Sequence, residues 1–201
     1  MPTPSRTSRE AIVAAARDIL ETRGPQGLTM QSVAQSVGVK APSLYKHVAD
    51  REALVRLVAD AAATELGAHL ATRSADGSVN TDVTAATATA TATAASDGTA
   101  SALAHLAHGL RAWAVAHPEA YRLVFSGHGS PEVAAATSGP VLTIAQSLAG
   151  DEDSLAAARM ITAWATGFIS MELAGAFQLG GDVDEAFTYG IEGLSRALAD
   201  R

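Results

Sequence analysis

The sequence contains no cysteine, few aromatic residues and no long apolar run. The lack of cysteine excludes disulfides and thiolate metal sites. No apolar stretch approaches the roughly eighteen residues that a membrane-spanning helix requires. The first ten residues, MPTPSRTSRE, have no apolar core of the kind found in a secretory signal. We therefore expect a cytoplasmic protein with no membrane association.

Motifs that carry enzyme chemistry are also missing. The chain has no nucleophile elbow, phosphate-binding loop, HExxH run or Cys-His set, so we expect neither an enzyme nor a cofactor. His105 and His108 are three residues apart, a helical spacing that can bind a metal, but no third ligand accompanies them. We interpret both as residues of a polar helix face and expect no metal site.

What remains is a chain of 201 residues that is 48% hydrophobic and rich in alanine. Such a composition favours an all-α protein with one large or two small domains. Apolar residues recur at helical spacing, with breaks at glycine and proline. The predicted helices are 8–23, a short helix from 29, a second short helix from 42, 50 to about 70, 101–116, a short helix 119–125, 131–148 with a kink at Pro140, 154–178 and 183–198.

The segment 29–48, TMQSVAQSVGVKAPSLYKHV, has the pattern of a helix-turn-helix. Thr29 is a suitable N-cap, and an apolar stripe follows as far as Val37. Gly38 then permits the positive φ of a tight turn. Pro42 suits the first turn of a second helix, where its missing amide has no cost.

One face of that second helix is apolar and the other is free. Leu44 and Val48 lie four residues apart and should be buried, while the only two lysines of the chain, Lys40 and Lys46, lie on the free face. Side chains of this kind suit phosphate oxygens, thymine methyls and base edges. The candidate DNA contacts are Thr29, Lys40, Ala41, Pro42, Ser43, Tyr45, Lys46 and His47.

The net charge of −7 is unevenly distributed. Residues 1–60 hold eight Lys or Arg against six Asp or Glu, whereas residues 61–201 hold six against fifteen. An acidic body repels DNA, so phosphate contact should be confined to the N-terminal part.

The run GVKAPSLYKHV resembles the turn and recognition helix of the TetR family of dimeric bacterial transcription regulators. The resemblance extends upstream through 9–23 and downstream into 50–54. It implies an N-terminal three-helix helix-turn-helix DNA-binding domain, 1–49, followed by a larger helical ligand-binding and dimerisation domain, 50–201. The later runs HPEAYRLVF and AWATGFISMELAGAF are similar to one subgroup of the family, although Thr166 stands where that subgroup often has histidine.

The Thr/Ala-rich stretch 72–100 has almost no bulky apolar residue. Neither face offers enough apolar area to offset the entropy of ordering the chain. We predict a flexible or weakly helical insertion, and a solvated linker is favoured over a lid.

The last two helices are candidates for assembly, because small residues on the first let another helix approach closely. Two such hairpins could form a four-helix interface about a two-fold axis, which the family resemblance also implies. The predicted interface residues are Ala163, Gly167, Ser170, Ala174, Phe187, Ile191 and Leu194.

A small-molecule cavity in the body would need large or polarisable apolar side chains. The candidates are Leu106, Trp113, Phe125, Trp164, Phe168 and Met171. The alternative is that these residues fill the core of an alanine-rich bundle. Glu172, within an apolar helix, is either a pocket acid or a helix-pairing residue.

The sequence therefore favours a homodimeric repressor that binds a palindromic operator in double-stranded DNA and is released by a small apolar or amphipathic effector. The alternative is a DNA-binding regulator without a small ligand, controlled by its abundance or by a protein partner.

Overall fold

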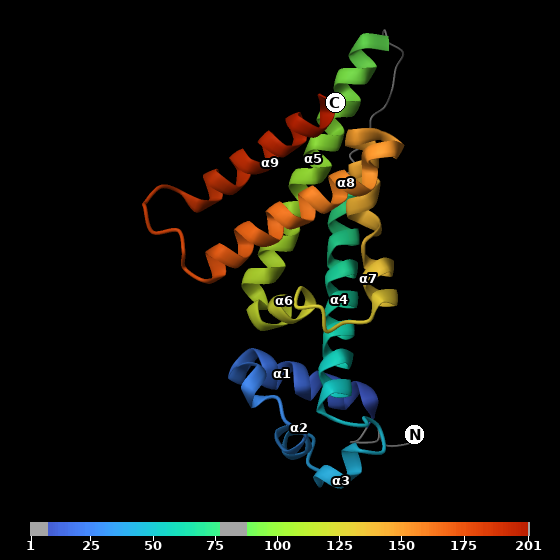
Figure 1. Ribbon diagram of the computed structural model, residues 1–201, viewed down its shortest axis with the longest axis vertical. Helices are drawn as coiled ribbons and strands as arrows, with labels where there is room; N and C mark the ends of the chain where they lie inside the picture. The colour runs from blue at the N-terminus through green and yellow to red at the C-terminus, as the bar shows by residue number, and fades with distance from the viewer. Residues whose placement is uncertain (1–7, 77–87, 201) are drawn as a thin grey trace. The chain divides into compact units, whose positions relative to one another are not determined.

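The computed structural model describes residues 8–76 and 88–200, which form helices and no strands. No helix within these ranges is both long enough and apolar enough to cross a membrane. Figure 1 shows the helices in chain order. They are α1 Arg9–Gly27, α2 Met30–Ser36, α3 Ala41–Leu44, α4 Arg51–Asp76, α5 Ala88–Ala116, α6 Pro118–Val124, α7 Pro131–Thr137, α8 Gly139–Leu173 and α9 Val183–Ala199.

The chain divides into two compact units, and each unit is formed by two separate stretches of the sequence. Unit 1 comprises residues 1–65 and 116–136, and unit 2 comprises 66–115 and 137–201. The predicted DNA-binding domain, 1–49, lies entirely within unit 1. That unit also takes in the start of α4 together with α6 and α7, which come from the middle of the sequence.

One apolar core holds unit 1 together. Side chains from α1, α2, α3 and α4 are buried against one another, and Leu123 of α6 joins the same cluster. Burial of a Leu, Ile or Val side chain contributes about 1.5–3 kcal/mol, so α6 is a structural part of this unit. The fully buried members include Ile12, Ala16, Val33, Leu44, Leu54 and Val58.

The connection between α1 and α2 depends on local backbone chemistry. The α1 helix is interrupted at Gly24, where φ is +66°, a value that favours glycine. The α2 helix begins with a reciprocal capping box, in which Thr29 Oγ1 accepts from the Ser32 amide at 3.1 Å. The Ser32 hydroxyl oxygen in turn accepts from the Thr29 amide at 3.0 Å. The predicted N-cap at Thr29 is therefore confirmed.

The body of unit 2 is built from α5, α8 and α9. Four aromatic rings from α8, α9 and the loop between them form a cluster. Trp164 is stacked on Phe187, with ring centroids 5.2 Å apart, and Phe168 is tilted against Phe177, with centroids 4.7 Å apart. Arg111 of α5 lies over the Phe187 ring, 5.1 Å from its centroid. The predicted all-α architecture is confirmed.

Several predicted helix boundaries were wrong. The expected helix 131–148 is two elements, because the chain leaves α7 at Thr137 and Pro140 lies in the first turn of α8. The helix expected from 154 to 178 is present as the second arm of α8, which follows a break at Gly150, where φ is +76°, and ends at Leu173. Proline is tolerated in the first turn of a helix, and the sequence alone does not distinguish that position from a kink inside a longer helix.

The Thr/Ala-rich stretch is helical at both of its ends. The α4 helix continues to Asp76 and α5 begins at Ala88, while residues 77–87 lie outside the described part of the chain. The helices therefore extend further into 72–100 than apolar periodicity indicates. Alternating Thr and Ala carry little periodic signal even where the backbone is helical.

Candidate nucleic-acid interface

The turn between α2 and α3 is set by Gly38. Its φ is +73°, and a side chain there would meet no neighbour within 4 Å, so glycine is required for the backbone and not for space. The chain is tied back to α2 by a bond from the Val39 amide to the Ala34 carbonyl, 2.9 Å long. The predicted turn at Gly38 is confirmed.

The α3 helix is shorter than the pattern predicts, with only the four residues Ala41–Leu44. The backbone nevertheless keeps turning, because the amides of His47 and Val48 both donate to the Leu44 carbonyl, at 2.8 and 2.9 Å. Leu44 is fully buried and Val48 is 3% exposed. The predicted apolar face is therefore correct, and it fixes which side of this segment points outward.

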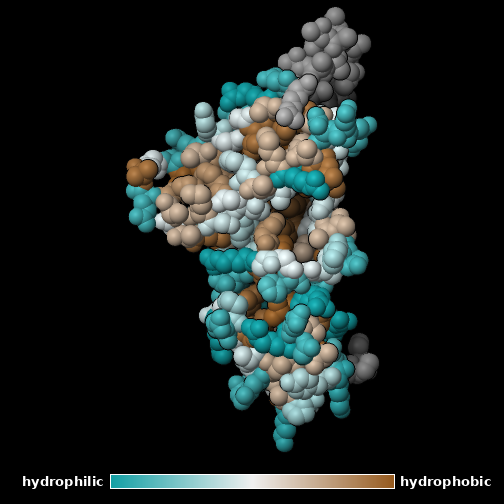
Figure 2. Space-filling model, in the orientation of Figure 1, coloured by the Kyte–Doolittle hydropathy of each residue, from teal (hydrophilic) through white to brown (hydrophobic). Residues whose placement is uncertain are grey.

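The outward side carries the predicted DNA-contacting residues. Tyr45 is 54% exposed, and its neighbours Lys46 and His47 are also exposed. Figure 2 shows hydrophilic side chains around α3 at the bottom of the view. In the predicted set, the exposed residues are Thr29, Lys40, Pro42, Tyr45, Lys46 and His47, and the half-buried ones are Ala41 and Ser43.

Thr29 differs from the rest of the set, because its hydroxyl is already used within the chain. It accepts from the Ser32 amide and donates to the Ser32 hydroxyl at 3.0 Å. Its side chain is therefore held in one orientation by the capping box.

The start of α1 lies near the end of the α3 segment. The pKa of the Glu10 carboxyl is lowered, first by hydrogen bonding from its own backbone amide and then from the Ser8 hydroxyl. The charges of Arg9 and His47 act in the same direction. Glu10 is thus an anion near His47 and offsets part of the positive charge of this surface.

Arg51 is a supporting residue that sequence reasoning missed. Its Nε donates to the Leu28 carbonyl and its Nη2 donates to the Pro25 carbonyl, both at 2.8 Å. The first residue of α4 thereby holds the connection between α1 and α2. An arginine at a helix start resembles a surface charge in sequence, and only the fold brings these carbonyls to it.

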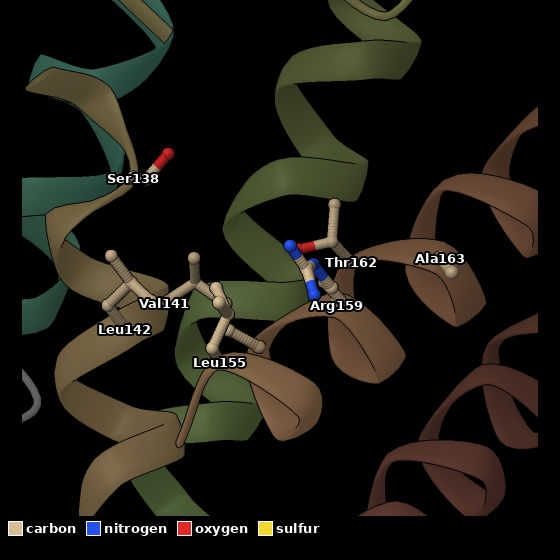
Figure 3. A pocket seen from close by; sticks show the side chains of 8 residues that line it. Ser138, Val141, Leu142, Leu155, Arg159, Thr162 and Ala163 are labelled. Atoms are coloured by element: carbon tan, nitrogen blue, oxygen red, sulfur yellow. The ribbon is translucent and has the colours of Figure 1, made fainter. Parts of the chain in front are cut away.

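Unit 2 contains an open groove of about 460 Å³ between the two arms of α8. Figure 3 shows its apolar side chains, Val141, Leu142 and Leu155, with Arg159 and Thr162 nearby. Ser138, Ala158 and Ala163 complete the lining. None of the six residues predicted to bind a ligand belongs to it.

The six residues predicted to bind a ligand lie outside this groove and are divided between the two units. Leu106 and Trp113 are buried in unit 2, and Trp164 and Phe168 pack within the aromatic cluster. Phe125 belongs to unit 1, where it packs on Tyr121 at 5.0 Å, so no one unit contains the whole set. Met171 is 48% exposed. Of the six, only Leu106 and Trp113 are core residues of the chain, while Trp164 and Phe168 are half-buried.

The predicted dimer residues divide into two classes. Phe187 and Ile191 are buried within the protomer, at 0% and 2% exposure, because α9 packs them against α8. A fully buried side chain offers no surface to a second chain, so these two do not belong to an exposed face. Leu194 is half-buried. The exposed members are four small residues, Ala163, Gly167 and Ser170 of α8 and Ala174, which caps the end of that helix.

Glu172 pairs helices within the chain. Both of its carboxylate oxygens accept from Arg111, at 2.7 and 2.6 Å, and Asp184 of α9 contacts the same guanidinium at 2.6 Å. The hydrogen bonds that Arg111 donates to Glu172 raise the pKa of Arg111 further above its already high value.

The two histidines that lie three residues apart on α5 also have local contacts. His105 faces the Ser101 hydroxyl at 3.5 Å, and His108 packs edge-on to Phe187. Over the described ranges, no group of three or more potential ligands is arranged to hold a metal ion.

Two family models match this chain. Residues 12–58, a range that contains α2, the turn and α3, match the model described as bacterial regulatory proteins, tetR family. Residues 103–194 match the model described as tetracyclin repressor-like, C-terminal domain. The two matches are separate and agree on the family.

Relatives of known name are similar in the N-terminal part. The chain is 39% identical over 62 residues to the tetracycline repressor protein class D of Escherichia coli. That alignment covers 31% of this chain and 27% of the relative. The likeness therefore spans about a quarter of the length of this relative.

Solved structures show the same fold over nearly the whole chain. A protein of unknown function from Rhodococcus sp. RHA1 has a TM-score of 0.76 at 24% identity, covering 98% of this chain and 97% of that one. A TetR variant from Acinetobacter baumannii AYE, in complex with minocycline, has a TM-score of 0.65 at 17% identity, covering 96% and 97%. The solved structures show the fold, and the two family models, over 12–58 and 103–194, place the chain in the TetR family of bacterial transcriptional regulators.

Proposed function

We propose that this protein is a homodimeric repressor that binds a palindromic operator through the segment 40–47. The observation that carries the proposal is the exposure of Tyr45, Lys46 and His47 above the buried Leu44 and Val48. Because one face of this segment is buried, the other face is free to enter the major groove of DNA, which is wide enough to admit a helix.

The roles within this segment follow from the chemistry of each side chain. Lys46 and Tyr45 are suited to phosphate oxygens, which position a protein on DNA without reading sequence. Lys40, Pro42 and Ser43 lie at the N-terminal end of α3, the end that contacts base edges in helix-turn-helix proteins. Because both lysines of the chain are in this segment, it concentrates positive charge within an otherwise acidic protein.

A dimer is proposed because one short recognition helix reads too few base pairs to select an operator. Two copies related by a two-fold axis read a palindrome. Support comes from the exposed small residues of α8 and of its C-cap, Ala163, Gly167, Ser170 and Ala174. Figure 2 also shows apolar surface over the α8–α9 region, where Met171, Phe177 and Tyr189 are exposed.

Release by a small amphipathic molecule is the regulatory part of the proposal. The groove between the arms of α8 combines apolar walls, Leu142 and Leu155, with the guanidinium of Arg159. A ligand shifts a conformational equilibrium only if it binds one state better than the other. This groove lies at a helix break, so movement of one arm of α8 changes the shape of the groove and hence its affinity for a ligand.

Control without a small ligand is the second candidate. It is favoured by the burial of Trp113 and by the packing of Trp164 and Phe168 against each other, because side chains packed in this way are not free to line a cavity. In that case abundance or a protein partner would set DNA occupancy.

The DNA-binding part is tested by operator selection from random duplexes, followed by titration of the selected site at several salt concentrations. Lys46→Ala should weaken binding and reduce the salt slope by about 0.9 per subunit, because one phosphate contact is lost. Tyr45→Ala should weaken binding as well. Arg122→Ala, an exposed cation of α6, is the control and should leave the slope unchanged. Equal affinity for wild type and Lys46→Ala would reject the assignment.

The regulatory part is tested with minocycline as the first probe, since a structural neighbour was solved with it. Binding should raise the melting temperature and weaken operator binding, and Arg159→Gln should reduce both effects. If minocycline at saturation leaves operator affinity unchanged, it is not an inducer, and the same measurement then extends to other amphipathic molecules. Operator binding that no such ligand changes supports the second candidate.

A further inference from the structure

Glu21 of α1 makes a contact with α6 that bridges about a hundred residues of sequence. One carboxylate oxygen accepts from the Ala120 amide at 2.9 Å, and the other accepts from the Glu119 amide at 3.2 Å. These are among the first amides of α6, and the N-cap residue His117 provides no side-chain hydrogen bond to them. A carboxylate is favoured at this end of a helix, because amides there lack backbone partners and carry partial positive charge.

Arg17 holds the Glu21 side chain from within α1. Its guanidinium bonds Glu65 of α4 through Nη1 at 3.0 Å and Nη2 at 3.4 Å, and its Nε lies 3.9 Å from Glu21. The Arg17 and Glu21 side chains are 15% and 20% exposed, so solvent screens these charges only in part. Helices α1, α4 and α6 thus meet at one charged cluster inside unit 1.

The contact has a role that apolar packing cannot fill. Leu123 and Tyr121 of α6 are buried, but the hydrophobic effect has no direction and allows one helix to slide on another. Hydrogen bonds weaken steeply when their geometry changes. The two bonds from Glu21 therefore fix where along α1 the start of α6 lies.

The helix-turn-helix is connected to the rest of the chain at two places. The helix-turn-helix joins the rest of the chain covalently through α4, while α6 follows α5 after a single residue, His117. Glu21 adds a second link, from the end of α5 through α6 to α1. The start of α6 is therefore tied to α1 by these two hydrogen bonds as well as by the shared apolar core.

We propose that Glu21 is a positioning residue that holds the helix-turn-helix in place against α6 and so determines which spacing of operator half-sites a dimer accepts. The proposal rests on the proposed operator binding. A dimer discriminates between spacings only as sharply as its two reading heads are held in position. Glu21 touches no DNA in this scheme, so it should affect spacing and not the choice of bases.

The first experiment measures operators with the selected half-sites and systematically varied spacers. Glu21→Ala should reduce the ratio of affinities between the best spacing and its neighbours by about tenfold, the size of effect that a coupling residue can have. Glu21→Gln, which keeps an acceptor oxygen, should show a smaller loss. Half-site base preference should not change in either variant.

Asp60→Ala is the matched control. The Asp60 carboxylate of α4 also accepts from a backbone amide in unit 1, that of Ser130 at 2.7 Å, but it does not connect to α1. A general loss of stability would affect both variants alike, whereas a positioning role affects Glu21 alone. Spacing discrimination retained in Glu21→Ala would overturn the proposal.

A second measurement does not depend on DNA. Because the chain has no cysteine, spin labels at Ala14→Cys in α1 and Arg122→Cys in α6 report their distance without background. The distance distribution should broaden with Glu21→Ala and stay narrow with Asp60→Ala. An unchanged distribution would reject the role of Glu21 whatever the DNA result. If wild type binds no operator at all, the proposed function fails instead. If Glu21→Ala does not fold, Glu21→Gln carries both measurements.

Discussion

Gly190 of α9 lies directly against the indole of Trp164 in α8. A Cβ at position 190 would overlap Cζ2 of Trp164 and would come within 2.9 Å of Cε2 and Cη2. The indole is also stacked on Phe187 and tilted against Phe168, so it cannot move away freely. The close approach of α8 and α9 therefore depends on the absence of a side chain at this residue.

Gly190→Ala should destabilise the protein by about 1–3 kcal/mol, the usual cost of overpacking a core. Gly193→Ala is the control, because a Cβ there meets nothing within 4 Å and alanine is the better helix former. That variant should be neutral or more stable by up to about 1 kcal/mol. Urea unfolding measures both, and equal effects would contradict the packing argument.

Arg111→Met should cost about 2 kcal/mol or more, because it leaves the carboxylates of Glu172 and Asp184 without their shared partner. The Arg111 side chain is only 13% exposed. Arg56→Met removes a guanidinium from an exposed pair with Glu52 and should change stability by less than about 0.5 kcal/mol. Chemical denaturation distinguishes the two. A similar small effect at both positions would show that solvent screens the Arg111 cluster fully.

Gly38→Ala should destabilise the helix-turn-helix by about 1–2 kcal/mol, since an alanine there must adopt a positive φ. Space is not the cause, because a Cβ at this position meets no neighbour. Gly38→Asn should cost less, because asparagine tolerates this conformation better. Melting temperatures of the three proteins test the order Gly, Asn, Ala, and an alanine variant as stable as wild type would disprove it.

Thr29→Ala should lower stability by about 1 kcal/mol through loss of the α2 cap. Thr29→Ser keeps the hydroxyl and should be close to wild type. Calorimetry gives the stability, and operator titration shows whether Thr29 also contacts DNA. A loss of affinity in Thr29→Ala beyond the change in folded fraction would indicate such a contact.

Assembly is tested at the exposed small residues of α8. Gly167→Arg introduces a long charged side chain on that face and should convert a dimer into a monomer, as measured by sedimentation. Ala14→Arg, on the exposed side of α1, should leave the dimer intact. A dimer that persists in Gly167→Arg would place the interface elsewhere.

The helix-turn-helix could be read from sequence because its signals are local. An N-cap at Thr29, a positive φ at Gly38 and a proline in the first turn of α3 each act over a few residues, and all three agree with the structure. The buried Leu44 and Val48 follow from helical spacing in the same way. Local chemistry of this kind is carried by short stretches of chain, and here it agrees with the fold as a whole.

The uses of the large apolar residues could not be read in this way. Helical spacing identifies Trp164, Phe168 and Phe187 as apolar-face residues, but not whether that face meets a ligand, a second copy or another helix of the same chain. The structure places them against one another and buries Phe187. That choice depends on which elements pack together, and packing is a property of the whole fold.

By itself, the sequence determined the all-α class and the segment 40–47 as the surface on which positive charge is concentrated. Only the tertiary structure brought α6 to α1 and placed Glu21 on the first amides of α6. It likewise joined Arg111 to Glu172 and Asp184. The physical reason is the separation in sequence over which each interaction acts. Capping, turn conformation and helical periodicity act between near neighbours in sequence, whereas these carboxylates find partners that are near only in space.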